Sequence, residues 1–133
     1  MVADLRPELR LFLLDDAAIF SAVGGARIHP VVMPQGEKRP SLVCNTITET
    51  TDHHTQGPSG LVMVRMQIDA YATLPNDADA LARAVKDRLD GYRGPMGAID
   101  VQGVFAETAR TGYESEPKLY RVGRDYLVWY GER

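Results

Sequence analysis

The chain has 133 residues, of which 44% are apolar and 25% charged, and its formal net charge is −3. This length suits a single domain spanning residues 1–133, with a core large enough to fold without cross-links. The weakly acidic balance argues against a general nucleic-acid binder, which needs a basic face. The single cysteine, Cys44, excludes a disulfide within the chain, and we interpret it as a buried, unreactive thiol.

The N-terminal residues indicate synthesis in the cytoplasm. Residues 1–8 are charged and contain no apolar run of the signal-peptide kind. No stretch of the sequence is long and uncharged enough to span a bilayer. We therefore expect no membrane partner.

Two short helices are predicted next. Leu5, Leu9 and Leu13 recur on one helical face. The second helix, Ala17–Val23, follows a capping aspartate at position 15 or 16 and is stopped by a pair of glycines. Capping explains these aspartates more simply than a catalytic carboxylate pair does.

Extended structure is expected after the second helix. Two prolines between Arg27 and Pro34 permit only an edge strand or an extended connector there. Ser41–Thr50 is rich in β-branched residues and is predicted to be a strand. The polar segment Glu49–Gly60 is interpreted as a long flexible loop.

The central unit is a strand followed by a helix, within Leu61–Gly94. One strand face is predicted to be buried and the other wet, because apolar and polar residues alternate; the polar face carries Arg65, Gln67 and Asp69. Asn76 or Asp77 is expected to cap the helix. Its apolar stripe should lie across the buried strand face, and the stripe consists of Ala78, Leu81, Val85 and Leu89.

The last part of the chain is predicted to contain two strands. Asp90–Gly97 is expected to be a glycine-rich turn, followed by the strand Ala98–Glu107 with Phe105 on its buried face. Ala106–Pro117 is interpreted as a second polar loop, and Leu119–Tyr130 as the final strand. The fold class is α+β: one mostly antiparallel sheet of about four strands, with N-terminal helices and one central helix packed on one face.

No set of residues predicts chemistry. His53 and His54 are adjacent, with Asp52 and Glu49 as the nearest further ligands, but metal binding needs another convergent group. We interpret the histidines as part of a solvated loop. We expect no catalytic residue, no metal and no cofactor.

Several segments in this order resemble the tail-completion, or tail-terminator, family of long-tailed bacteriophages and gene transfer agents. They include the amphipathic start up to Val23-Gly24, the strand Ser41–Glu49, and the strand Val64–Tyr71 leading into a helix. The most specific pieces are Asp90–Gly94 and the closing Val128-Trp129-Tyr130. The resemblance covers nearly the whole chain.

The resemblance implies a structural role without enzymatic activity. Family members form a hexameric ring on the head-proximal end of the tail tube, stop tube polymerisation and present a surface to the head connector or head-closure protein. DNA passes through the lumen without specific binding. The chain is therefore expected in the tail or neck of a virion, and in the host bacterial cytoplasm during assembly.

Ring formation needs contacts with neighbouring copies, with the tube protein and with the connector. The residues expected to make these contacts carry polar or aromatic side chains on the two predicted loops or on the polar sheet face: Glu49, Asp52, His53, His54, Arg65, Asp69, Arg110, Tyr113, Glu114 and Arg121. For Arg65, Asp69 and Arg121, a solvated sheet face is the simpler alternative.

Two other classes of protein stay open. One is a different neck or minor tail protein, such as a head-closure protein. The other is a small-molecule-binding or enzymatic α+β domain, which a deep pocket with convergent His29, His53 or Asp15 would favour.

Overall fold

The computed structural model describes residues 5–25, 27–30, 40–54, 57–114 and 118–132, and describes their side chains except at 52–54, 57–60, 114 and 132. Helices and strands follow one another in the order α1 (Leu5–Leu14), α2 (Ala17–Val23), β1 (Ile28–Pro30), β2 (Ser41–His54), β3 (Gly57–Ala72), α3 (Pro75–Leu89), β4 (Gly94–Met96), β5 (Ile99–Glu114) and β6 (Leu119–Glu132).

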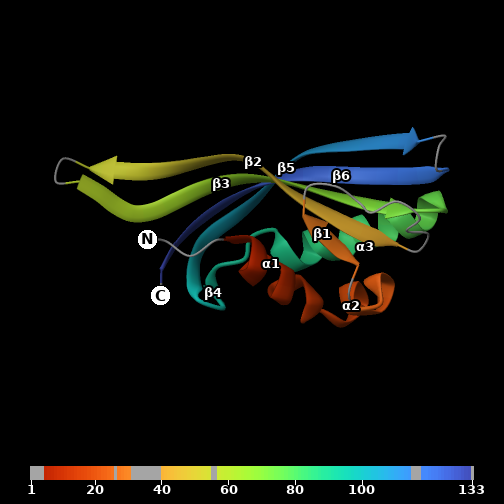
Figure 1. Ribbon diagram of the computed structural model, residues 1–133, viewed down its shortest axis with the longest axis horizontal. Helices are drawn as coiled ribbons and strands as arrows, with labels where there is room; N and C mark the ends of the chain where they lie inside the picture. Colours follow the sequence, from red (N-terminus) through yellow and green to blue (C-terminus); the bar gives the residue numbers. More distant parts are fainter. Residues whose placement is uncertain (1–4, 26, 31–39, 55–56, 115–117, 133) are drawn as a thin grey trace.

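The strands form one curled sheet in the order β1-β2-β3-β6-β5-β4. Its neighbouring strands are antiparallel, except that β1 runs parallel to β2. The helices lie against one face of the sheet, which we call the helix-covered face, and the other is the open face (Figure 1). The predicted α+β class is confirmed, with four long strands and two short ones at the edges. The short strand β4 replaces part of the glycine-rich turn expected there.

The core lies between β3 and α3, as the alternating pattern predicts. On β3 the buried side chains are Val62, Val64, Met66, Ile68 and Ala70. On α3 the predicted stripe is buried in full: Ala78, Leu81, Val85 and Leu89. Burial of these two apolar surfaces against each other is the main source of stability for this layer.

The predicted cap of α3 is wrong. The N-cap residue is Leu74, which offers no side-chain oxygen, and Pro75 occupies the first helical position. Proline suits that position because its missing N–H has no helical partner there and its φ is already helical. At the other end Gly91 has φ 80°, the left-handed conformation expected for it.

The N-terminal helices are held by local caps and by contacts with α3. Asp16 caps α2 by accepting from the N–H groups of Ala18 and Ile19 at 3.0 and 3.2 Å. Arg88 of α3 donates to the carbonyl oxygen of Phe12 at 3.1 Å, and its guanidinium lies 3.7 Å from the centre of the Phe12 ring. These contacts fix α1 beside α3 over the helix-covered face.

Both predicted polar loops are wrong where the structure describes them, because those residues continue the strands; 55–56 and 115–117 lie outside the described residues. β2 runs to His54 and β3 starts at Gly57, while β5 runs to Glu114 before β6 starts at Leu119. The two resulting hairpins have their outer ends at opposite ends of the sheet, and the β2–β3 hairpin extends beyond the rest of the molecule (Figure 1). The sequence hides them because a ribbon exposed on both faces shows no apolar alternation, although its threonines favour strands.

The prediction that Phe105 lies on the buried face is wrong, because its side chain is 55% exposed. In the pairing of β5 with β6, Val101 lies opposite Tyr130 and Gly103 opposite Trp129, so Gln102 is an extra residue in β5. Such a bulge reverses the alternation beyond it. Val104 is therefore the buried residue, and Phe105 lies on the open face.

Candidate functional site

The open face carries a network of ion pairs across β3, β6 and β5. Arg65 of β3 lies 2.6 Å from the carboxylate of Glu107 on β5 and 3.5 Å from that of Asp125 on β6. Arg110 of β5 donates to the other oxygen of Asp125 at 2.8 Å. The Asp125 side chain is only 15% exposed, so it is the least accessible member of this group. The hydrogen bond to Asp125 raises the pKa of Arg110 and keeps that arginine charged.

A second carboxylate on this face is that of Asp69. It was expected to be exposed to solvent, and this prediction is wrong because the residue is buried. It is 7% exposed and accepts a hydrogen bond from the Gln67 amide at 2.9 Å. Burial raises the pKa of Asp69, while the Gln67 hydrogen bond and the positive charges of Arg121 and Arg110 act in the opposite direction. Arg121 is thus an electrostatic partner of Asp69.

Two glycines make room for these side chains. Gly123 lies opposite Asp69 in the sheet, and a Cβ added there would lie 1.8 Å from Asp69 Oδ1. Gly112 lies opposite Arg121, where a Cβ would lie 2.8 Å from a guanidinium nitrogen. The network depends on strand positions without side chains, a requirement that single-residue charge patterns do not reveal.

Four of the predicted contact residues come together here: Arg65, Asp69, Arg110 and Arg121. Glu49 does not join them. It lies opposite Val64 on β3, so its exposed side chain is on the helix-covered side of the sheet. Contact of any of these residues with another subunit stays a prediction.

The remaining predicted contact residues lie toward the hairpin tips. Tyr113 is 52% exposed and its ring packs against that of Tyr120 at 4.8 Å between centroids. Glu114 ends β5, and 52–54 (Asp52, His53 and His54) end β2, with side chains outside those that the structure describes. The interpretation of the two histidines therefore stays a prediction.

Sequence reasoning missed an apolar patch beside the ion pairs. Met63 lies opposite Trp129, and Phe105 lies opposite Leu127, all on the open face. Met63, Leu127 and Trp129 are half-buried, and Phe105 is exposed. A signal was available, because Leu127 and Trp129 alternate with the apolar core residues of β6 and so had to lie on the opposite face.

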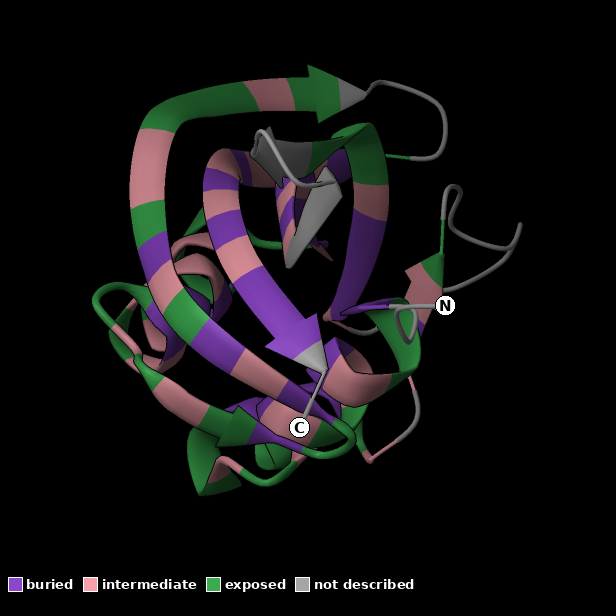
Figure 2. Ribbon diagram, turned by 90° about the vertical axis from the view of Figure 1, so that its left-hand side faces the viewer, coloured by how far each residue is buried: buried purple, intermediate pink, exposed green. Residues whose placement is uncertain are grey.

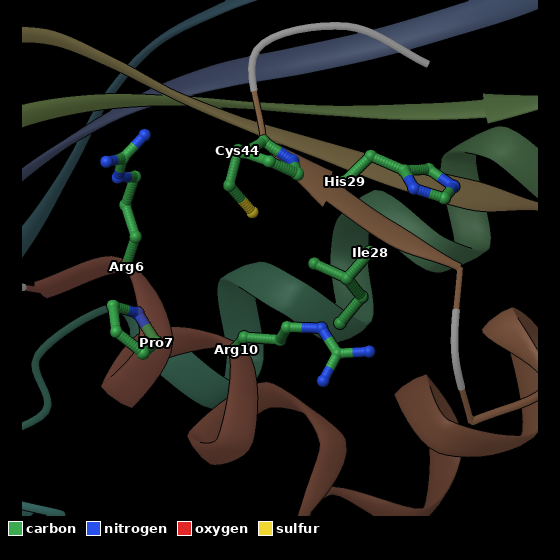
Figure 3. Close-up of a pocket in the computed structure, with 7 residues that line it drawn as sticks. Arg6, Pro7, Arg10, Ile28, His29 and Cys44 are labelled. Atoms are coloured by element: carbon green, nitrogen blue, oxygen red, sulfur yellow. The ribbon is translucent and has the colours of Figure 1, made fainter. Parts of the chain in front are cut away.

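A hollow of about 340 Å³ lies between α1 and the β1–β2 edge, and Figure 3 shows its lining: Arg6, Pro7, Arg10, Ile28, His29, Pro30 and Cys44. Cys44 is buried as predicted, and burial raises its pKa to about 12, so the thiol is protonated at neutral pH. Asp15 borders a different hollow, next to Arg88. His29 and Asp15 therefore border different hollows, and the convergence of these two that would favour a small-molecule-binding or enzymatic domain is not found.

The described residues contain neither a cluster of metal ligands nor a helix that could span a membrane. Within the described ranges, no three side chains among His, Cys, Asp and Glu gather closely enough to hold a metal ion. None of the helices that the structure describes combines the length and the apolar character required to cross a bilayer.

Solved structures share this architecture. A chain from the virion of a native gene transfer agent particle matches with a TM-score of 0.71 and 17% identity, covering 96% of this chain and 94% of that chain. A second solved chain matches with a TM-score of 0.56 and 10% identity over 96% of both chains. Identities this low show the fold alone: a curled, mostly antiparallel sheet with helices on one face. Among curated proteins there is no match.

The family assignment comes from the sequence. The model of the family Tail completion protein gp17 matches residues 7–131. Because this match spans nearly the whole chain, the chain belongs to that family. Its members are structural proteins that complete phage tails and are not enzymes. The predicted resemblance is thereby confirmed.

Proposed function

We propose that this chain forms a hexameric ring that caps the head-proximal end of a tail tube. The ring ends polymerisation of the tube protein and offers its other side to the head connector or head-closure protein. The observation that carries the proposal is the family match over residues 7–131. The chain then acts as a virion component of the tail or neck, after assembly in the host cytoplasm.

The arrangement of the helices and hairpins around the sheet supports this role. The helices and the core occupy one face of the sheet, while the other face is open and the outer ends of the two hairpins lie at opposite ends of the sheet (Figure 1). A ring of identical copies needs two different patches on each copy, which meet around the ring. Hairpins at opposite ends of the sheet supply two such regions without involving the core.

The charges of the open face fit a lumen through which DNA passes without being held. Three arginines, at positions 65, 110 and 121, lie close to three carboxylates, at positions 69, 107 and 125. A face balanced in this way attracts phosphates far less than a basic patch does. The overall charge of −3 has the same consequence.

The proposal is tested with tail tubes of the particle that encodes this chain. Purified protein added to polymerising tube protein should shorten the tubes and add a ring at one end, both visible by negative-stain electron microscopy. Particles lacking the chain should contain overlong tubes that are not joined to heads, and supplying the chain should restore joining. Tubes that grow to the same length with bare ends in the presence of the folded protein would refute the proposal.

A further inference from the structure

The two long outer edges of the sheet are each only partly covered. β1 pairs with residues Leu42–Cys44 of the 14-residue strand β2, and β4 pairs with Ile99–Val101 of the 16-residue strand β5. Beyond β4, the Gly91 N–H donates to the carbonyl oxygen of Val104, and the Asp90 carboxylate accepts from the Ala106 N–H. Along Asn45–His54 and Thr108–Glu114, no strand among the described residues pairs with the outer edge.

We infer that these two free edges pair with each other between neighbouring copies of this chain, so that the ring is held by one sheet continuing from subunit to subunit. The inference rests on the proposed ring. A free strand edge presents a row of backbone donors and acceptors that a further strand can satisfy.

Strand direction favours this pairing. The antiparallel succession β2, β3, β6, β5 makes β2 and β5 run in opposite directions. A rotated copy that extends the sheet therefore places its β2 antiparallel to the β5 of its neighbour. The contact joins two different edges, so it is heterologous, which is what a closed ring of more than two copies requires.

The covered parts of the edges set the offset between copies. Through the sheet register, Thr51 on β2 lies level with Val101 on β5, which is paired with β4. Likewise Thr111 on β5 lies level with Leu42 on β2, which is paired with β1. In two copies side by side at the same level, β4 or β1 would thus lie between the two free edges. We call the contact between the free edge of β2 and the free edge of β5 of the next copy the seam. Only a stagger of roughly 25 Å, about eight residues at 3.3 Å each, brings free edge to free edge. Closed sheets need such a stagger, since it accompanies the tilt of the strands to the axis.

The edges carry only part of the protection that usually prevents strand pairing. Charged residues and shifts of pairing register occur on both. Lysine and proline, two of the strongest protective residues, are missing from Asn45–His54 and from Thr108–Glu114. Threonine, a residue that favours strands, occupies four positions of the first segment and two of the second. Exposed apolar side chains lie on both: Ile47 is 44% exposed and Tyr113 is 52% exposed.

Proline substitution tests the seam, because proline removes the N–H and blocks one side of a strand. Successive residues of a strand direct their N–H groups to opposite sides. Thr50→Pro and Thr51→Pro are therefore made on β2. On β5 the pair is Thr111→Pro and Glu114→Pro, an odd number of residues apart, because Gly112 has no room for a side chain beside Arg121. For each edge, the proline variant that loses only the outward N–H should keep the denaturant unfolding midpoint of the wild type, and that variant is used to measure ring formation. Thr50→Ala and Thr111→Ala are the matched controls that keep the N–H.

Native mass spectrometry, on the free protein and on protein released from capped tubes, gives the readout. Each proline variant should lose the ring, and the alanine controls should keep it. A mixture of the β2 variant with the β5 variant should give a dimer of about 29 kDa, twice the 14.7 kDa of one chain, because one intact seam remains. Neither variant alone should form that dimer.

Folded proline variants of both edges that still form rings would overturn the seam alone. Self-dimers of a single variant would overturn it as well, since they would indicate an isologous pairing of like edges. Wild-type protein that caps no tube and forms no ring would instead reject the proposed function, and the seam with it.

Discussion

The body is the part of the sheet that the helices cover, and the two hairpin arms are the parts of the β2–β3 and β5–β6 hairpins outside it. Both are built from the same long strands but differ in what stabilises them. In the body, β3 alternates buried and half-buried residues, and α3 covers the buried ones. Toward the arms, residues 46–51 and 108–111 are exposed on both faces, and Figure 2 shows the change from buried to exposed along the strands. Stability is therefore concentrated in the body, so the arms are free to serve assembly.

The largest effect on stability is expected from a substitution in the body alone. Leu81 on α3 is 2% exposed, and Leu81→Ala should destabilise the fold by about 2–5 kcal/mol through lost burial and a residual cavity. Leu11→Ala, at a leucine that is 62% exposed, is the control and should stay within about 0.5 kcal/mol of wild type. Denaturant unfolding measures both. Equal midpoints for the two variants would show that the α3 layer is not the core.

Cys44 reports whether the body stays closed. Its folded pKa of about 12 lies above the ordinary 9.0, so the native thiol should react with a thiol reagent roughly a thousand-fold more slowly than the unfolded one at pH 8. The folded state favours the protonated thiol. The contribution of Cys44 to the free energy of unfolding is therefore complete below pH 9 and is lost as the pH rises from 9 toward 12. Cys44→Ala should reduce that alkaline loss. Fast native labelling would mean that the body opens locally.

Gly123 tests the close packing at the buried carboxylate of the open face. Gly123→Ala should cost about 1–3 kcal/mol, because the new Cβ would overlap Asp69 Oδ1 at 1.8 Å. In an Asp69→Ala background the cost should fall, since the overlapping oxygen is gone. A double-mutant cycle from denaturant melts measures this coupling. Additive effects would show that the two residues do not share the space.

The smallest stability effect is expected for Arg65, although we expect it to matter for assembly. Arg65→Met removes ion pairs with Glu107 and Asp125 whose side chains are partly exposed, so it should cost at most about 1 kcal/mol. The control Arg83→Met removes an exposed ion pair with Asp79 on α3. Tail completion in particles should decrease for Arg65→Met and stay normal for Arg83→Met. Normal completion with both would exclude Arg65 from the assembly surface.

Several features could be read from single-sequence patterns. The apolar stripe of α3, the buried face of β3, the α2 cap at Asp16 and the burial of Cys44 depend on residues close together in sequence. The position of Phe105 could not be read in this way, because one extra residue in β5 reversed the alternation after it. Burial of Asp69 depended on Gly123, which is far along the chain and becomes its neighbour only through sheet pairing.

The α+β class, the layer in which α3 covers β3, and a resemblance to phage tail-completion proteins all follow from the amino-acid sequence, because periodicity and segment order are local properties of a chain. That the polar segments after Thr50 and after Ala106 are strands of long hairpins follows from the three-dimensional fold alone. The same holds for which parts of the two sheet edges stay open. Pairing between distant strands sets both features, and polar residues exposed on both faces carry no periodic signal of that pairing.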